Sequence, residues 1–282
     1  MKTLIYGANG QLGRDLKRVF APMGDCVGVD LPEVDIADLE SARRAAQNAA
    51  PDVIINAAAY TNVDGAESDA ETCWRVNADG ARHVAEAADR VGAPVLYVST
   101  DYVFDGTKST PYEPDDKPNP KGVYAESKAA GERAVKETAS RWFIVRTAWL
   151  YGPGGNNFVE KMLGLAQQRS ELRVVEDETG SPTHSLDLAE VIKALVQTDA
   201  YGVYHGVNRG QCSRFEFARA IFDMAELDVS VQPCKAAEFP SAAPRPAYSV
   251  LNPAGLENVT GNAMRDWRDA LRHYMQRREG SS

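Results

Sequence analysis

Short apolar runs alternate along the first 150 residues with longer segments whose apolar residues recur at helical spacing. The runs predict strands over residues 2–6, 26–30, 51–56, 94–101 and 142–146. The segments between them predict helices over residues 15–20, 70–91 and 124–139. Strands that alternate with helices in this way favour a parallel, doubly wound α/β sheet. Ligands of such sheets bind at the carboxyl ends of the strands.

The pattern becomes less regular after Thr147. It predicts helices over residues 158–169, 185–197, 215–225 and 264–275, and strands over residues 172–175 and 202–207. We therefore expect a dinucleotide-binding domain over residues 1–150 and a smaller, C-terminal substrate-binding part over residues 151–282. The segment near residues 172–200 is open to either assignment.

A glycine-rich loop separates the first strand from the first helix. Gly7, Gly10 and Gly13 form a G-x-x-G-x-x-G pattern, and Gln11 and Leu12 lie between the last two glycines. A strand before such a loop and a helix after it are the context of a Rossmann-type dinucleotide fingerprint. The glycines allow a tight turn, close approach of a pyrophosphate and close helix packing, while the helix N-terminus attracts the phosphates. We therefore expect this loop to bind a nicotinamide dinucleotide.

The second strand ends in Asp30, 17 residues after Gly13. An acid at this point can bind both hydroxyls of the adenosine ribose, which favours NADH, whereas a 2′-phosphate would be repelled. Asp35 precedes Ile36 and is either the N-cap of the next helix or a border of the adenine pocket. The third strand is followed by Ala57, Ala58, Ala59 and Thr61, whose small side chains let a cofactor pass close to the backbone.

Tyr124 and Lys128 lie one helical turn apart, and Thr100 ends the strand before them. An ammonium beside a phenol favours the phenolate, so we expect Lys128 to lower the pKa of Tyr124 and make it a proton donor near neutral pH. The same spacing is typical of a surface helix whose lysine stem covers a tyrosine ring. The glycine loop earlier in the chain favours the interpretation of this pair as a proton donor and its lysine partner.

Composition narrows the class of protein. The 282 residues are 44% hydrophobic and 25% charged, with a formal net charge of −9 and no run of basic residues, so neither nucleic acid nor an anionic membrane is an expected partner. The four cysteines are scattered and the four histidines lack ligand spacing, which predicts reduced thiols and no metal site. The chain begins in a strand without a signal region, and no apolar run reaches the roughly 18 residues of a membrane span. We therefore expect a cytoplasmic protein.

Together, the glycine loop, Thr100 and the Tyr124–Lys128 pair resemble the extended short-chain dehydrogenase/reductase family. The resemblance implies that Tyr124 donates a proton to a ketone oxygen, that Thr100 hydrogen-bonds the same oxygen, and that Lys128 also binds the nicotinamide ribose. Tyr124 and Lys128 therefore contact both the cofactor and the reaction centre. Matching the family's serine or threonine position selects Thr100 over its neighbour Ser99.

Six further blocks resemble one branch of that family, the dTDP-4-dehydrorhamnose reductases. They are Gly10–Gly13, Asn56–Glu67, Ser99–Gly106, Arg146–Tyr151, Gly180–Thr183 and Pro244–Ser249. The resemblance implies reduction of the 4-keto group of dTDP-4-dehydro-L-rhamnose by NADPH or NADH. It places Val63, Thr100, Asp101, Tyr102, Trp149 and Arg245 at the substrate. It also implies a homodimer and, in some members, Mg²⁺ held by glutamates at the interface; Asp15 stands where such a glutamate is expected, so the ion does not carry over directly.

Two of these residues have a second interpretation. Arg245, between Pro244 and Pro246, is suited to bidentate contact with a diphosphate but equally to a surface salt bridge. Trp149 either packs against the sugar or fills a domain interface.

Three rival functions remain open. A nucleotide-sugar 4,6-dehydratase of the same fold needs Thr-Asp-Glu, whereas Tyr102 occupies the third position here. A reductase-like regulatory subunit, as in the β subunit of methionine adenosyltransferase, binds NADP and a protein partner instead of turning over a sugar. Another nucleotide-sugar reductase or an epimerase would share the same catalytic residues.

Overall fold

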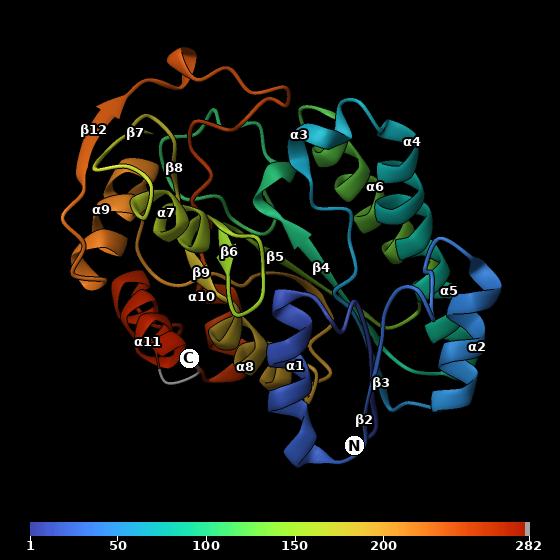
Figure 1. Cartoon of the computed structure of the whole chain (residues 1–282). Coiled ribbons are helices and arrows are strands. Elements are labelled where there is room, and N and C mark those ends of the chain that lie inside the picture. The colour runs from blue at the N-terminus through green and yellow to red at the C-terminus, as the bar shows by residue number, and fades with distance from the viewer. Residues whose placement is uncertain (280–282) are drawn as a thin grey trace.

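The computed structural model, which describes residues 1–279, is built around a parallel sheet of six strands (Figure 1). The strands lie in the order β10-β5-β4-β3-β1-β2, and all neighbouring pairs are parallel. Their bounds are Thr3–Tyr6 (β1), Cys26–Val29 (β2), Val53–Asn56 (β3), Val95–Thr100 (β4), Trp142–Thr147 (β5) and Gly202–His205 (β10). The predicted doubly wound sheet is therefore confirmed. The chain reverses direction across the sheet between β1 and β3, which is where such folds bind ligands.

Successive side chains of a strand point to opposite faces, so each strand contributes to two apolar cores. Ile5 of β1 packs on one face with Leu16 of α1 (Gln11–Phe20) and with α8 (Ser185–Leu195) and α10 (Ala254–Thr260). Leu4 packs on the other face with α2 (Leu39–Ala49), α5 (Gly80–Val91) and α6 (Val123–Thr138). The two layers of helices hold the sheet rigidly between them, and this fixes the carboxyl ends of its strands.

A second lobe has its own apolar core, centred on residues such as Phe217 and Trp267. Its helices are α7 (Phe158–Ala166), α9 (Arg214–Met224) and α11 (Trp267–Glu279), and its short strands are β6 (Leu150–Tyr151), β7 (Glu171–Val175), β8 (Thr179–Gly180), β9 (Thr183–His184), β11 (Cys212–Ser213) and β12 (Ser230–Cys234). In Figure 1 this lobe lies beside the carboxyl ends of β4 and β5.

The segment near residues 172–200 is shared between the two lobes. β7 pairs with β12 in a separate two-stranded sheet, whereas α8 packs against α1 on the main sheet. β10 also joins the main sheet from beyond residue 151. The chain therefore crosses between the lobes several times, and a division at residue 150 stays a prediction.

Several element boundaries differ from those that the pattern predicts. The helix predicted over residues 70–91 is a helical run of three pieces: α4 (Ala70–Trp74), a π-helical segment at Arg75–Asp79, and α5. The last helix begins at Trp267 rather than at residue 264, and α7 ends at Ala166 rather than at residue 169. β12 was not predicted because it contains Pro233, which an edge strand tolerates.

Among residues 1–279, none of the helices combines the length and the apolar character that crossing a bilayer requires.

Candidate active site

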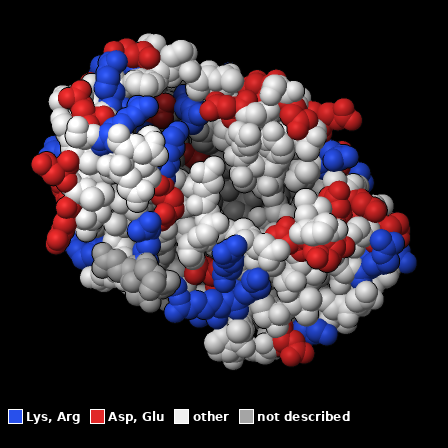
Figure 2. Space-filling model, viewed as in Figure 1, with Lys and Arg blue, Asp and Glu red and all other residues white. Residues whose placement is uncertain are grey.

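A cavity of about 1260 Å³ lies between the carboxyl edge of the sheet and the second lobe, and Figure 2 shows it as a hollow in the middle of the molecule's face. Pockets for one small ligand typically enclose roughly 300–1,000 Å³, so this cavity has room for two. Every candidate binding residue named from the sequence lines it: Gly7, Gly10, Gln11, Leu12, Asp30, Asp35, Ile36, Ala57, Ala58, Ala59, Thr61, Val63, Thr100, Asp101, Tyr102, Tyr124, Lys128, Trp149 and Arg245. The fold therefore brings these residues to one site, and their binding roles stay predictions.

The glycine loop forms the floor of the cavity at the ends of β1 and β3. Gly7 has a φ of +78°, and a Cβ atom there would lie 2.5 Å from the backbone nitrogen of Ala58. α1 begins directly after Gly10, and no side chain caps its first turn. The uncapped first turn of α1, at the edge of the cavity, fits the pyrophosphate of a dinucleotide.

Asp30 contacts the glycine loop directly. One carboxylate oxygen accepts a hydrogen bond of 2.8 Å from Asn9 N–H, and the other accepts one of 2.9 Å from Leu31 N–H. Both oxygens of Asp30 therefore accept bonds from backbone N–H groups, one of them in the glycine loop. Contact with a ribose would have to share or replace these bonds.

Asp35 is at the cavity border and does not cap a helix. Asp38 is the N-cap of α2, where it accepts hydrogen bonds from Glu40 N–H and Ser41 N–H. The interpretation of Asp35 as that N-cap is wrong, because the turn that starts the helix lies three residues later. Asp35 instead accepts a hydrogen bond from Ala37 N–H and lines the cavity beside Ile36.

A buried asparagine on the neighbouring helix anchors the segment after β3. Asn77, on the π-helical segment, accepts a hydrogen bond from Tyr60 N–H and donates one to the Tyr60 carbonyl. These two bonds fix the backbone between Ala59 and Thr61, both of which line the cavity. The role of Asn77 depends on a partner 17 positions away and was not predicted.

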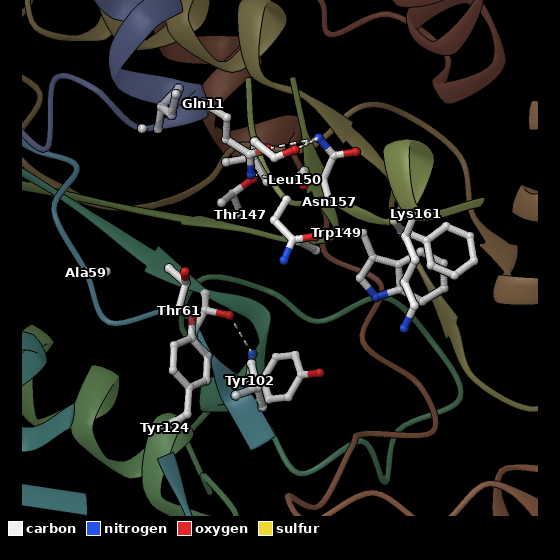
Figure 3. A pocket seen from close by; sticks show the side chains of 18 of the residues that line it. Gln11, Ala59, Thr61, Tyr102, Tyr124, Thr147, Trp149, Leu150, Asn157 and Lys161 are labelled. Carbon is white, nitrogen blue, oxygen red and sulfur yellow. Dashed lines mark hydrogen bonds between the residues drawn. The ribbon is translucent and has the colours of Figure 1, made fainter. Parts of the chain in front are cut away.

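Tyr124 and Thr100 lie on the cavity wall formed by α6 and the end of β4. Figure 3 shows Tyr124 and Thr61 on one side of the cavity, with Trp149 and Lys161 across from them. The Thr100 hydroxyl donates a 3.0 Å hydrogen bond to Asp101 Oδ1 and accepts one from Tyr102 N–H. The ring of Tyr102 meets that of Tyr124 edge-on, with 5.6 Å between centroids. Two tyrosines and a threonine therefore converge on one small region.

Lys128 is buried one turn below Tyr124. Its ammonium donates a 2.7 Å hydrogen bond to the Val98 carbonyl and lies 4.1 Å from the centroid of the Tyr97 ring. Burial lowers the pKa of Lys128 to about 7, against the opposing effect of the Glu132 carboxylate.

The expected lowering of the Tyr124 pKa by Lys128 is wrong. Burial raises the pKa of Tyr124 well above its ordinary value, and Thr100 opposes this shift only in part. The physical reason is that the desolvation of a phenolate decides the sign of the shift. Tyr124 is therefore a phenol at neutral pH, which is the form that donates a proton.

Asp101 is buried beside Thr100 and lines the cavity. Burial raises its pKa to about 6, although hydrogen bonding to Ser249 and Thr100 favours the charged form. Asp101 thus fixes the orientation of the Thr100 hydroxyl. Tyr102, rather than an acid, follows it and packs against Tyr124, so the pair of acids that a dehydratase needs is not present at these positions.

Trp149 and Arg214 form the opposite wall. The guanidinium carbon of Arg214 lies 3.5 Å from the centroid of the Trp149 ring and 5.3 Å from that of Phe158. Its closest acid is Glu178, at 3.7 Å, and within residues 1–279 its side chain makes no hydrogen bond. Arg214 was not predicted as a site residue. The sequence pattern around it is the capping box of Ser213, which indicates the start of α9 and not a binding site. Trp149 also contacts Phe217 of the second core, so it is both a cavity residue and an interface residue.

Arg245 lies at the rim of the cavity and is exposed. It forms an ion pair of 2.7 Å with Asp64, which also lines the cavity. Both interpretations of Arg245 thus describe part of its environment, because it is paired and at the same time faces the cavity.

Asp15 lies away from this site, on the buried side of α1. Its carboxylate accepts a 2.5 Å hydrogen bond from the Ser185 hydroxyl, and burial raises its pKa. Across residues 1–279, histidine, cysteine and acidic side chains form no cluster of three or more that could hold a metal ion.

Comparison with known proteins agrees with this geometry. The family model of the RmlD substrate binding domain matches residues 1–279. This chain belongs to that family. It is 44% identical to a dTDP-4-dehydrorhamnose reductase of Mycobacterium tuberculosis, over 96% of this chain and 91% of that one. It is 41% identical to the spore coat polysaccharide biosynthesis protein SpsK of Bacillus subtilis, over 99% of each chain.

Among solved structures, it is similar to dTDP-4-dehydrorhamnose reductase from Bacillus anthracis in complex with NADP. The TM-score is 0.95 at 42% identity, with 98% of this chain and 100% of that chain covered. The fold and the family inferred from the sequence are therefore confirmed.

Proposed function

We propose that this member of the family reduces the 4-keto group of dTDP-4-dehydro-L-rhamnose to give dTDP-L-rhamnose, with NADPH or NADH as the reductant. The observation that carries the proposal is that Thr100, Tyr124 and Lys128 line the same cavity as the glycine loop. The substrate is inferred from the names of the relatives, and the type of reaction is inferred from the residues that line the cavity.

The glycine loop and the small residues after β3 would hold the dinucleotide. Gly7, Gly10, Gln11 and Leu12 would contact the pyrophosphate, Asp30, Asp35 and Ile36 the adenosine, and Ala57, Ala58, Ala59, Thr61, Tyr124 and Lys128 the nicotinamide half. When bound, the reduced nicotinamide supplies a hydride to the carbonyl carbon of the sugar. The NADP complex of the relative from Bacillus anthracis supports use of NADPH, while Asp30 favours NADH, so we propose that both serve.

Tyr124 would donate the proton. Its raised pKa keeps the phenol protonated until negative charge develops on the substrate oxygen. The Thr100 hydroxyl has one proton, which it donates to Asp101 Oδ1. It would turn to donate this proton to the same substrate oxygen and stabilise that charge. Lys128 then favours the phenolate that remains, and Val98 O holds its ammonium in place.

The second lobe would bind the sugar nucleotide. Arg214 and Arg245 place two cations at the cavity, and a diphosphate is the dianionic group that suits them. Val63, Tyr102 and Trp149 would surround the sugar. No metal is part of this proposal; the carboxylate of Asp15 is already bonded to Ser185. A cytoplasmic homodimer that acts in polysaccharide biosynthesis is the setting that fits the relatives.

The test is a panel of 4-keto nucleotide sugars, with oxidation of NADH and of NADPH followed separately. Turnover with dTDP-4-dehydro-L-rhamnose above all other members is expected. Turnover of a different member instead would assign another nucleotide-sugar reductase. No oxidation with any member, together with retained NADP binding, would favour the regulatory subunit.

A further inference from the structure

Val63 is the one residue of the Val63-Asp64-Gly65-Ala66-Glu67 block that has a role in the function proposed above, yet two other residues of the block contact two parts of the site. It forms the short helix α3 (Val63–Ala66) with Glu67 as its C-cap. Its two acids point to partners that are far apart in the sequence. In Figure 1, α3 lies beside the start of α6 and below the loop that follows β12.

Asp64 holds the loop after β12. We name residues 239–246 of this loop the strap. One carboxylate oxygen of Asp64 accepts a 2.7 Å hydrogen bond from the guanidinium of Arg245, and the other accepts one of 3.2 Å from Ala243 N–H. Both oxygens are therefore used on a segment about 180 positions away. The strap crosses from the second lobe to the first, where Asp64 binds it with both carboxylate oxygens.

Glu67 holds the start of the catalytic helix. Its Oε1 atom accepts a 2.8 Å hydrogen bond from Val123 N–H, the first residue of α6 and the neighbour of Tyr124. α6 has no side-chain cap of its own, because its N-cap residue is Gly122. Glu67 therefore satisfies an N–H group that the helix leaves free, and its negative charge suits the positive end of the helix.

The two attachments meet at Gly122. This residue has a φ of +84°, and a Cβ atom there would lie 2.7 Å from Glu67 Oε1 and 3.0 Å from Cδ of Pro244 in the strap. The strap, α3 and the start of α6 are thus in contact at one point. A displacement of α3 would move both the residue that binds substrate and the residue that donates the proton.

We propose that α3 is a brace that positions the two halves of the active site, with Glu67 setting the place of Tyr124 and Asp64 setting that of Arg245. The inference rests on the proposed function. Neither acid takes part in the chemistry; both are positioning residues. The brace aligns the sugar end of the cavity with the proton donor through one rigid turn of helix.

Asp64 is tested with a double-mutant cycle. Asp64→Ala is expected to raise the KM for dTDP-4-dehydro-L-rhamnose about tenfold with kcat nearly unchanged, because Arg245 and the strap lose their anchor. Amide exchange of strap residues, Ala243 above all, should become several-fold faster. In an Arg245→Ala background, the same change should have little further effect on KM. A lower KM in Asp64→Ala would overturn the proposal, since it would mean that Asp64 only repels the diphosphate.

The role of Glu67 is tested by measuring its effect on kcat separately from its effect on ligand affinity. Glu67→Ala is expected to lower kcat about tenfold and to leave the dissociation constant of dTDP, measured by calorimetry, nearly unchanged. Glu67→Gln should restore most of the rate, because its amide oxygen can accept the same bond from Val123 N–H. A rate that stays low in Glu67→Gln, or an unchanged rate in Glu67→Ala, would contradict the assigned role.

Asp69→Ala is the matched control. Asp69 caps the next helix, α4, by accepting a hydrogen bond from Thr72 N–H. Within residues 1–279, its carboxylate has no hydrogen bond to the strap or to α6. It is expected to lower the melting temperature without changing kcat or KM. If Asp64→Ala and Glu67→Ala each changed both kcat and KM, and these changes followed the loss in melting temperature, the block would only stabilise the fold. The proposal that α3 is a brace would then be wrong.

The failure of this inference can be told from the failure of the proposed function. If the wild-type protein reduces no 4-keto sugar, the function is wrong. Exchange of the strap amides and of the first turn of α6 still tests the brace, with dTDP alone as the ligand. If the strap amides exchange at the same rate in Asp64→Ala and in the wild type, the proposal that α3 is a brace is wrong, whatever the substrate.

Discussion

The ammonium group of Lys128 donates its hydrogen bond to the backbone carbonyl of Val98, on the strand that carries Thr100 at its end. This bond ties the catalytic helix to the sheet below the active site. It also holds a buried charge in contact with a carbonyl dipole instead of water. Burial, and not this bond, lowers the pKa of Lys128 to about 7, whereas burial raises that of Tyr124, which stays protonated.

The pH dependence of kcat/KM should report Lys128. Burial lowers its pKa to about 7, so the ammonium form is present below that pH and is lost as the pH rises through it. Because the charged form favours the Tyr124 phenolate that remains after proton transfer, kcat/KM should fall with rising pH above about 7. Initial rates at low substrate between about pH 6 and 9 measure this. A flat profile over that range would mean that Lys128 keeps its charge and that the burial effect is compensated.

Tyr124→Phe should remove the proton donor. Turnover is expected to fall by about 10² or more, the scale of a lost general acid, while the affinity for NADPH stays near that of the wild type. Steady-state kinetics and fluorescence titration of the cofactor measure the two effects. Tyr204→Phe is the matched control, since Tyr204 lies on the outer strand β10 and its hydroxyl donates to the carbonyl of Ala200, just before that strand. Wild-type turnover in Tyr124→Phe would remove Tyr124 from the mechanism.

Asp30→Ala should change cofactor choice and also weaken the glycine loop. The variant loses the negative charge that opposes a 2′-phosphate, so the preference for NADPH over NADH should increase. It also loses the bond from Asn9 N–H, so the KM for NADH should rise about tenfold. Asp30→Asn keeps an oxygen that can accept the bond from Asn9 N–H. It should therefore increase the preference for NADPH while raising the KM for NADH less than Asp30→Ala does. An unchanged ratio of the two KM values in both variants would show that Asp30 does not contact the ribose.

Glu132→Gln should destabilise the fold strongly. Glu132 and Arg146 form a buried bidentate pair with both N–O distances at 2.8 Å, and Ser99 donates a further bond to Glu132. Removing one charge leaves the other buried without a counter-ion, which costs about 3–5 kcal/mol. Urea denaturation measures the free energy of unfolding.

The exposed pair Arg272–Asp269 provides the control for that experiment. Asp269→Asn should change the free energy of unfolding by less than about 1 kcal/mol, because solvent screens exposed charges. Similar losses in the two variants would mean that the burial of Glu132 contributes little.

Much of the active site was predictable from the sequence, because it depends on short-range features of the chain. The glycine loop requires a positive φ at Gly7 and a close backbone contact, and both leave a mark in the residue types themselves. Tyr124 and Lys128 share one helix face, which spacing alone predicts. The alternation of strands and helices also predicted the sheet, since buried strands need apolar side chains on both faces.

Only the tertiary structure decided which distant groups meet and how strongly they are desolvated. Arg214 stacks on Trp149, and Asp64 bonds Arg245, across separations that no local pattern encodes. The expected shift of the Tyr124 pKa had the wrong sign for the same reason. Spacing places a charge beside a phenol, but the sign of the shift depends on how completely the surrounding elements exclude water, and that is a property of the packed molecule.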